Sequence, residues 1–317
     1  MKELAAILDC WKRGAAEGAM LATIVKTVGS SYRRAGAHML VLRDGATIGS
    51  ISGGCLEQDV IAHAAEVRAS GEAKLLSYDT TLEEDVLFGV GLGCKGVIEI
   101  LVEPILCAAG KLRLVEEVFA TGKSAVVRHE HGGEAIFEET VQPPIKLFIF
   151  GAGYDAIPLA RLAAQMGFVV TVVDRRPAYA TRERFSDAEV VVGNGVNFSI
   201  PERSAAVVMS HHYLSDRDFL KALLPLPIGY LGLIGPRRRA EKLLQEIREE
   251  GVMVGDELLA KLHNPVGLDI GAEGPEEIAL AILAEINAVF AGHGGGMLRE
   301  KKGPIHSPRA ELPQWPE

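Results

Sequence analysis

Residues 145–156 read IKLFIFGAGYDA, and this stretch decides the fold of the second half of the chain. An apolar run that ends in a glycine turn is typical of a buried parallel strand leading directly into a helix. Asp174 ends the next apolar run, 23 residues after Gly151. Because strand, glycine turn, helix and distant acid occur in this order, the stretch predicts a nucleotide-type α/β fold.

Predicted strands and helices continue to alternate downstream of this stretch. Strands are predicted over 146–150, 169–173, 205–210 and 230–234, and helices over 157–166 and 216–224. Such alternation implies a Rossmann-like, doubly wound parallel sheet covered by helices. Two prolines at 143 and 144 end the preceding pattern, so we expect domains over 1–143 and 144–291 and a flexible C-terminal tail over 292–317.

The first half has the pattern of an α+β domain. Two hairpins are indicated, one turning at residues 43–45 and one at 132–133. The other expected elements are helices over 2–17, 56–69 and 111–120 and strands over 19–28 and 97–102. In the helix over 56–69, Val60, Ala64 and Val67 share one face, so we expect them to be buried.

The length and charge of the chain exclude several classes of protein. With 317 residues the chain is long enough for two buried cores. Its 42 acidic and 33 basic residues give a net charge of −9, which argues against nucleic-acid binding. No apolar run approaches the roughly 20 residues of a membrane span, and charged residues interrupt any would-be signal peptide. We therefore expect a cytoplasmic protein without a membrane span.

Two glycine-rich loops of the first half each carry a cysteine. The first reads GSISGGCLEQ over 49–58, so Gly53 and Gly54 come directly before Cys55 and a predicted helix. The partial positive charge of a helix N-terminus favours a thiolate, which makes Cys55 a candidate reactive thiol.

The second loop reads GVGLGCKG over 89–96, where Gly93 and Lys95 flank Cys94. A loop so rich in glycine is able to form an anion-binding nest around this thiol. The alternative for both loops is a tight turn with a small buried thiol. Cys10 and Cys107 are interpreted as structural, and the spacing of the four cysteines matches no close-spaced zinc pattern.

Candidate ligand contacts of the second half begin at the glycine turn. Gly151 and Gly153 allow the backbone to approach a phosphate, and Asp174 is placed to accept hydrogen bonds from a ribose. Arg175 and Arg176 follow directly and are placed to hold a 2′-phosphate or another anion, unless they are only a solvated arginine pair.

Three further candidates follow later strands, where open α/β sheets bind ligands. His211 is predicted to hydrogen-bond a ligand or transfer a proton, and too few ligands surround it for a metal. Arg237 and Arg238, followed by Arg239, open a predicted helix, and this run of arginines is expected to bind phosphate, with a basic helix face as the alternative.

These motifs together resemble the signature segments of the xanthine dehydrogenase accessory protein family, of the XdhC/CoxI type. The similar segments are GSSYRRAGAHMLV (29–41), GSISGGCLE (49–57), GLGCKGVIEILVEP (91–104), FGAGYDA, VVDRRP, GLIGPRRR and NPVGLDIGAEGPEEIALAILAEI. The resemblance covers about residues 1–291.

By position, Cys55 and Cys94 match the family's glycine-flanked cysteines, and Gly151, Gly153 and Asp174 match its nucleotide-type turn. One position departs from the family pattern. Members commonly have histidine after the second glycine of this turn, where this chain has Tyr154, so a role for that histidine does not carry over.

The resemblance implies a protein that binds the molybdenum cofactor, assists its sulfuration and protects it until insertion into a xanthine dehydrogenase-type molybdenum hydroxylase. Cys55 and Cys94 would then contact molybdenum, a metal soft enough for sulfur, and glycine-loop amides and arginines would hold the pterin phosphate. A homodimer, a cysteine desulfurase partner and no turnover of its own are the further expectations. From the glycine fingerprint alone, an NAD(P)-dependent oxidoreductase or a nucleotide-sensing module remain alternatives.

Overall fold

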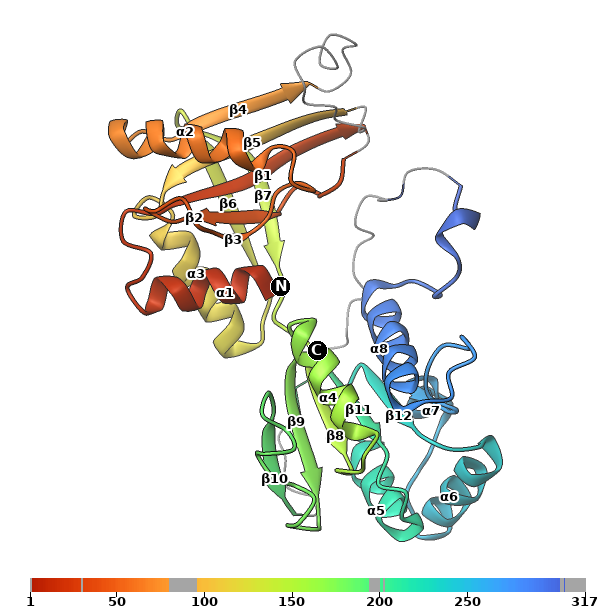
Figure 1. The fold of residues 1–317 in the computed structure, drawn as a ribbon. Helices are drawn as coiled ribbons and strands as arrows, with labels where there is room; N and C mark the ends of the chain where they lie inside the picture. The colour runs from red at the N-terminus through yellow and green to blue at the C-terminus, as the bar shows by residue number, and fades with distance from the viewer. Residues whose placement is uncertain are drawn as a thin grey trace. The chain divides into compact units, whose positions relative to one another are not determined.

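The computed structural model describes residues 2–29, 31–79, 96–193, 200–201, 203–302 and 305. The chain divides into two compact units, Met1–Pro143 and Pro144–Glu317, called unit 1 and unit 2 below (Figure 1). Across the described ranges, no helix is long and apolar enough to cross a membrane.

Unit 1 contains a five-stranded antiparallel sheet in the order β3-β2-β1-β5-β4 and a separate hairpin, β6–β7. Its strands are β1 (Met20–Gly29), β2 (His38–Val41), β3 (Thr47–Gly49), β4 (Lys74–Asp79), β5 (Gly96–Pro104), β6 (Ala125–His131) and β7 (Glu134–Val141). Its helices are α1 (Lys2–Lys12), α2 (Glu57–Ser70) and α3 (Ala109–Thr121).

The alternation of side chains along β1 explains how the sheet is covered. Met20, Ala22 and Ile24 pack in one buried cluster with Val60 and Val67 of α2. On the other face, Leu21 of the same strand packs with residues of α1 and α3. Successive residues of a strand point to opposite faces, so both faces of this sheet are buried under helices.

Most elements predicted for unit 1 are confirmed, including both hairpins and the buried face of α2. The helix predicted over 2–17 is too long, because α1 ends at Lys12. Gly14 and Gly18 adopt φ of 72° and 69°, which an α-helix cannot contain. Strand β4 is a further element that the sequence pattern missed.

Unit 2 contains a six-stranded sheet in the order β10-β9-β8-β11-β12-β13, in which every pair is parallel. The strands are β8 (Lys146–Phe150), β9 (Val169–Asp174), β10 (Glu189–Val192), β11 (Ser204–Val208), β12 (Tyr230–Leu233) and β13 (Leu262–His263). The helices are α4 (Ala156–Gln165), α5 (Tyr213–Leu223), α6 (Arg237–Glu249), α7 (Asp256–Ala260), α8 (Pro275–Ala291) and the short 3₁₀ helix η2 (Leu298–Glu300).

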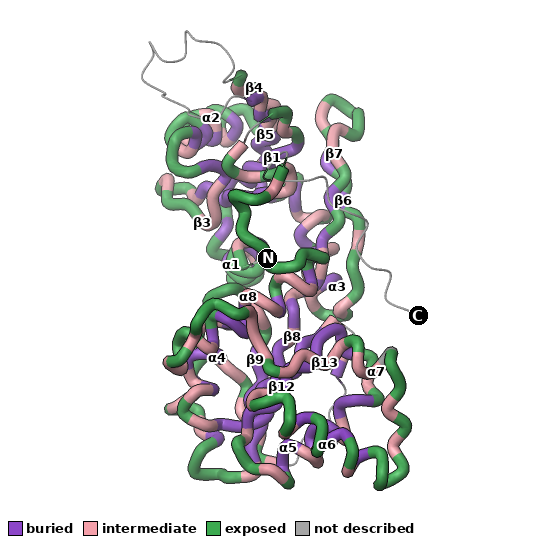
Figure 2. The backbone as a smooth tube through the Cα atoms, turned by 90° about the vertical axis from the view of Figure 1, so that its right-hand side faces the viewer, coloured by how far each residue is buried: buried purple, intermediate pink, exposed green. Residues whose placement is uncertain are grey.

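Helices cover both faces of this sheet. One apolar cluster joins α4 and α8 to one face, and a second joins α5 and α6 to the other. Figure 2 marks the strands between these helices as largely buried. This is the doubly wound parallel sheet that the sequence predicts, and it places the carboxyl ends of β8, β11 and β12 at one edge.

The chain changes direction between β8 and β11. From β8 it continues through α4 to β9 on one side, and from β11 through α5 to β12 on the other. Ligands of open α/β sheets bind at such a topological switch point, outside the carboxyl ends of the strands. The turn after β8 and the residues after β11 therefore define the candidate site of unit 2.

Candidate functional site

The glycine turn packs tightly against the chain that follows β11. Gly151 has φ of 124°, and a Cβ there would lie 2.5 Å from the carbonyl oxygen of Met209. No other residue type fits this backbone without displacing the end of β11. Gly151 thus holds β8 and β11 together at the switch point.

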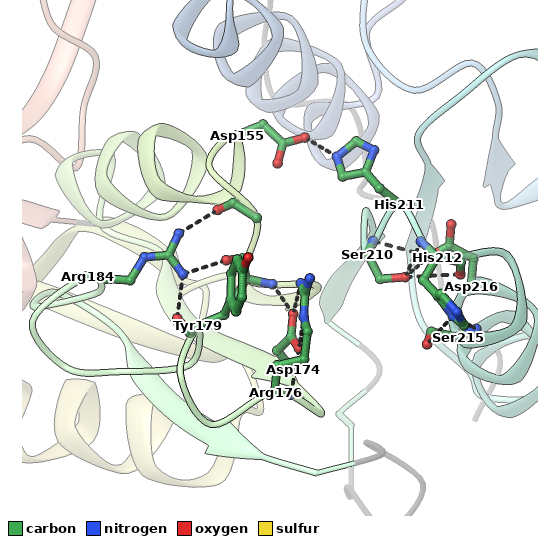
Figure 3. A network of polar contacts seen from close by, with 12 residues as sticks. Asp155, Asp174, Arg176, Tyr179, Arg184, Ser210, His211, His212, Ser215 and Asp216 are labelled. Atoms are coloured by element: carbon green, nitrogen blue, oxygen red, sulfur yellow. Dashed lines mark hydrogen bonds and ion pairs between the residues drawn. The ribbon is translucent and has the colours of Figure 1, made fainter.

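Asp174 at the end of β9 binds this turn directly (Figure 3). The side chain is buried, and its Oδ2 accepts a hydrogen bond from the backbone N–H of Ala152 at 2.7 Å. Arg176 donates to the same carboxylate from its backbone N–H at 2.8 Å, from Nε at 2.9 Å and from Nη2 at 2.7 Å. Burial alone would raise the pKa of Asp174, but these hydrogen bonds hold it below its usual range.

Two arginines hold this arrangement: Arg176, which the sequence pattern singled out as an anion contact, and Arg184, which it did not assign to the site. The Arg176 guanidinium lies 4.0 Å from the centre of the Tyr179 ring. Arg184 Nη1 donates to the carbonyl oxygens of Ala152 at 2.8 Å and Tyr179 at 2.7 Å. Both oxygens of the predicted ribose contact, Asp174, are therefore engaged within the protein, and the turn is fixed from both sides (Figure 3).

Arg175 points away from this cluster. Its Nη2 donates to Asp218 of α5 at 2.8 Å, and its guanidinium lies 5.5 Å from the Phe219 ring centre. The structure therefore places Arg175 against α5, whereas Arg176 lies beside Asp174.

Asp155 and His211 meet at the switch point. His211 Nε2 lies 2.7 Å from Asp155 Oδ2, and the His211 side chain is 55% exposed (Figure 3). The hydrogen bond with Asp155 raises the pKa of His211 against the opposing effect of burial. Asp155 is a site residue that the sequence pattern missed, although it directly follows Tyr154 in the glycine turn.

A second polar cluster follows β11. Ser210 Oγ donates to Asp216 Oδ1 at 2.5 Å, and Arg239 Nη2 pairs with Asp216 Oδ2 at 2.7 Å. The predicted helix over 216–224 is too short at its start, because α5 begins at Tyr213, where His212 accepts a hydrogen bond from Ser215 N–H. Such side-chain capping satisfies a helix N-terminus.

Of the three consecutive arginines that open α6, Arg237 and Arg238 are exposed and Arg239 faces the cluster. Arg239 lies four residues before the buried Leu243, on the inward face of this helix. This spacing of four residues from a buried leucine is the sequence signal that Arg239, unlike Arg237 and Arg238, faces inward.

The loop of Cys55 is well defined in unit 1. Cys55 is exposed and lies two residues before the first residue of α2. Ser52 Oγ accepts hydrogen bonds from the N–H groups of Gly54 and Leu56, both at 3.1 Å. Glu57 in turn accepts from Ser52 N–H at 2.8 Å and from its hydroxyl, and although burial would raise the pKa of Glu57, these hydrogen bonds lower it.

The segment after β1 packs beside the Cys55 loop. A Cβ at Gly53 would lie 3.9 Å from the Tyr32 ring, which itself is 65% exposed. Arg33 Nη1 and Nη2 bind the Glu3 carboxylate at 2.7 and 2.6 Å, and Nη1 also donates to Ser50 at 3.2 Å. This bidentate ion pair fixes the segment that carries Tyr32.

The second thiol loop, with Gly93, Cys94 and Lys95, lies outside the described residues. The flanking residues Asp79 and Gly96 end β4 and begin β5, and Gly96 pairs with Gly29 of β1. Within the described part of the chain, no group of three or more His, Cys, Asp or Glu residues is arranged to hold a metal.

The other two thiols differ from one another. Cys10 is buried in the core beneath α1, as a structural residue would be, whereas Cys107 is exposed. An exposed thiol does not pack in a core, so the structure does not support the interpretation of Cys107 as a structural residue.

Comparisons with known proteins agree with this architecture. The XdhC and CoxI family model matches residues 13–79, and the XdhC Rossmann domain model matches residues 147–286. A Bacillus subtilis protein described as a probable xanthine dehydrogenase subunit is 35% identical, over 85% of this chain and 92% of its own length.

Two further relatives span most of the chain. The molybdenum cofactor insertion chaperone PaoD of Escherichia coli is 26% identical over 86% of this chain and 84% of its own. A crystal structure described as a xanthine dehydrogenase from Bacillus halodurans superimposes with a TM-score of 0.79 at 31% identity, covering 91% of this chain and 96% of that one. With both family models matching in order and relatives similar over both units, the chain belongs to the XdhC and CoxI family.

Proposed function

We propose that this protein is an accessory factor that takes up the molybdenum cofactor as cargo, assists its sulfuration, protects it and passes it to a xanthine dehydrogenase-type molybdenum hydroxylase. Membership of the XdhC and CoxI family supports this role, as does the likeness to a molybdenum cofactor insertion chaperone. The protein acts by holding and transferring the cofactor and has no turnover of its own.

The observation that carries the proposal is the exposed thiol of Cys55 on a loop with a fixed backbone. A thiol that must reach a cofactor has to be accessible, and a fixed loop reduces the entropy lost when it binds. Molybdenum in a dithiolene is soft enough to accept a thiolate, so the donor fits the cargo. Cys94 is the second thiol of this proposal.

Unit 2 offers, within its own sheet edge, a surface for a phosphate group in the same proposal. Gly151 and Gly153 shape the turn at the switch point, His211 stands beside it, and Arg237 and Arg238 are exposed cations at the start of α6. Arginine and imidazolium donors suit a phosphate group. Asp174 and Arg175 support this surface by holding the turn and α5.

Binding of NAD(P), in an oxidoreductase or a nucleotide-sensing role, is the second candidate. It is favoured by the glycine turn and the acid at the end of β9, the pair that binds dinucleotides in this fold. The hydrogen bonds from Ala152 and Arg176 to Asp174 weigh against it, because they occupy the groups that a ribose and a pyrophosphate would use.

The remaining expectations concern the protein's partners, its oligomeric state and its location in the cell. A cysteine desulfurase would supply sulfur for the cofactor, and a homodimer and a cytoplasmic location stay predictions. Of these, the desulfurase is the partner that the sulfuration role requires.

The experiment is reconstitution of the client hydroxylase in vitro with purified accessory protein, with hydroxylase activity and molybdenum content measured together. The Cys55→Ala variant should lower cofactor loading or sulfuration several-fold, while Cys107→Ala, which removes another exposed thiol of unit 1, should match the wild type. Equal loading and equal activity with wild-type and Cys55→Ala protein would remove Cys55 from the proposal.

A further inference from the structure

Asp155 and His211 form an acid–imidazole pair at the edge of the unit 2 sheet. Asp155 follows the glycine turn after β8, and His211 follows β11, the neighbouring strand. The pair therefore lies at the switch point, where this topology leaves a crevice for ligands.

The geometry leaves one nitrogen of His211 available. Nε2 is committed to Asp155 Oδ2 at 2.7 Å, and within the described residues Nδ1 has no hydrogen-bond partner. The Asp155 side chain is 14% exposed, whereas His211 is 55% exposed. The carboxylate is thus the less exposed member of the pair, and Figure 3 shows the second ring nitrogen of His211 directed away from Asp155.

Two backbone features place this pair, and one of them, the positive φ of His211, is energetically unfavourable. A Cβ at Gly153 would lie 2.6 Å from Asp155 Oδ1, so any side chain there would push the carboxylate out of place. Among the described residues, His211 alone has a positive φ outside glycine, at 57°. Such a conformation is unfavourable for a residue with a Cβ. A half-exposed ring gains little packing in return, so packing does not account for the arrangement.

The charges around His211 favour a protonated ring. Three charged groups act on it: Asp155 from the start of α4, Asp216 from α5 and Arg239 from α6. Asp216 is already paired with Arg239 at 2.7 Å, which leaves Asp155 as the direct partner of the imidazole. Because this hydrogen bond raises the pKa of His211, Nδ1 carries a proton to donate over more of the neutral range.

We propose that the Asp155–His211 pair binds the terminal phosphate monoester of a ligand, with Nδ1–H of His211 donating to a phosphate oxygen. A phosphate monoester loses its second proton near pH 6 and is close to a dianion at neutral pH, so it gains most from a charged donor. The exposed Arg237 and Arg238 follow β12 at the same edge of the sheet and add positive charge.

A dinucleotide fits the pair less well than a monoester does. Its pyrophosphate would need the amide of Ala152, which already donates to Asp174. The inference extends the proposed cofactor binding to the phosphate end of the cofactor and rests on it only for the ligand's identity.

Diethyl pyrocarbonate labelling of the full chain, read by peptide mass spectrometry, tests the proposal. The reagent acylates an unprotonated imidazole nitrogen, here Nδ1. Phenyl phosphate, the probe, should slow labelling of His211 by about fivefold or more at concentrations well above its Kd. Labelling of His293, an exposed histidine at the end of α8, should not change. NAD, which has no monoester, should leave the His211 rate unchanged.

The Asp155→Asn variant should label faster at His211 and lose the protection by phenyl phosphate. Calorimetry gives a second measurement, in which His211→Gln loses phenyl phosphate binding and His293→Gln keeps it. Absence of protection, equal protection of His293, protection by NAD, or protection that survives Asp155→Asn would each overturn the proposal. Phenyl phosphate contains neither molybdenum nor pterin, so such a failure leaves the test of Cys55 unaffected.

Discussion

The carboxylate of Asp174 shows how one side chain changes what a familiar sequence pattern means. In a dinucleotide-binding unit the acid at this position faces a ribose. Here its two oxygens receive hydrogen bonds from Ala152 and Arg176, and the guanidinium also covers the Tyr179 ring. Arg176 is therefore the residue that separates this turn from an ordinary dinucleotide site.

Replacing Arg176 by alanine removes the guanidinium hydrogen bonds to both Asp174 oxygens, which should leave the carboxylate available to a ribose. We expect weak or no binding of NADH and NADPH to the wild type and a gain of about tenfold in the variant, the effect of one added hydrogen bond to a charged group. Fluorescence titration of the reduced nucleotide measures this directly. Arg175→Ala is the matched control, because Arg175 pairs with Asp218 and not with Asp174. Tight binding by the wild type, or no gain in Arg176→Ala, would refute this interpretation of the turn.

The reactivity of Cys55 is a second property of a single residue. Cys55 and Cys107 are both exposed, and each lies two residues before the first residue of a helix, α2 or α3, whereas Cys10 is buried. Because alkylation needs an accessible thiol, iodoacetamide near pH 7 should modify Cys55 faster than Cys10. Peptide mass spectrometry resolves the three rates. A rate at Cys55 no higher than at Cys10 would show that the Cys55 thiol is not accessible to a reagent in solution.

At the scale of elements, the contact between β8 and β11 depends on Gly151. The Gly151→Ala substitution adds a Cβ 2.5 Å from Met209 O at a φ of 124°, so both clash and backbone strain act. We expect a loss of about 3 kcal/mol in the free energy of unfolding, measured by urea denaturation. Gly251→Ala has φ of 86° but no atom within 4 Å of the added Cβ, so it should cost only about 1 kcal/mol. Equal losses would mean that close packing at the switch point is not what Gly151 provides.

The hairpin β6–β7 is joined to the sheet of unit 1 by a buried polar network. Glu139 of β7 lies 3.0 Å from His38 Nε2 and 3.4 Å from His129 Nε2, and His38 Nδ1 lies 3.0 Å from the Thr23 hydroxyl. Burial alone would raise the pKa of Glu139, but the two imidazoles lower it to about 2. The network therefore stabilises unit 1 only while Glu139 is ionised.

The sign of the pH dependence follows from this lowered pKa. The contribution of Glu139 is complete above its unfolded-state pKa of 4.5 and is lost as the pH falls toward about 2. The total lost is on the order of 3 kcal/mol. Urea denaturation at pH 6, 4 and 3 should show this loss in the wild type and a smaller one in Glu139→Gln. A variant with the same slope of stability against pH would contradict this role of Glu139.

For the whole molecule, the sequence predicts elements well wherever local pattern decides them. The run before the glycine turn gives β8 with the bounds Lys146–Phe150, because a short apolar run between proline and glycine favours a single buried strand. Strand β10 was missed because its residues, Glu189–Val192, are at most half-buried and carry little alternation. The helix predicted over 2–17 extends past the end of α1 because Gly14, with φ of 72°, cannot continue an α-helix.

The site was less predictable than the fold, since its contacts join residues distant in the chain. His211 and Asp155 lie 56 residues apart, and Asp174 lies 22 residues from Ala152. Local spacing shows that these residues follow strands, but only the sheet order brings β8 and β11 together. The sequence therefore predicts which edge of the sheet carries the candidate site, and the pairing of side chains there needs the structure.

The proposed role as a carrier of the molybdenum cofactor can be checked by the cofactor content of the purified protein itself. The chain is co-expressed with the machinery that makes the molybdenum cofactor, purified, and assayed for molybdenum by mass spectrometry and for pterin by fluorescence. We expect molybdenum and pterin to copurify in equal amounts, close to one per chain, and Cys55→Ala to retain several-fold less than Cys107→Ala. Wild-type protein purified without molybdenum or pterin, while the same cells load an active hydroxylase, would contradict it.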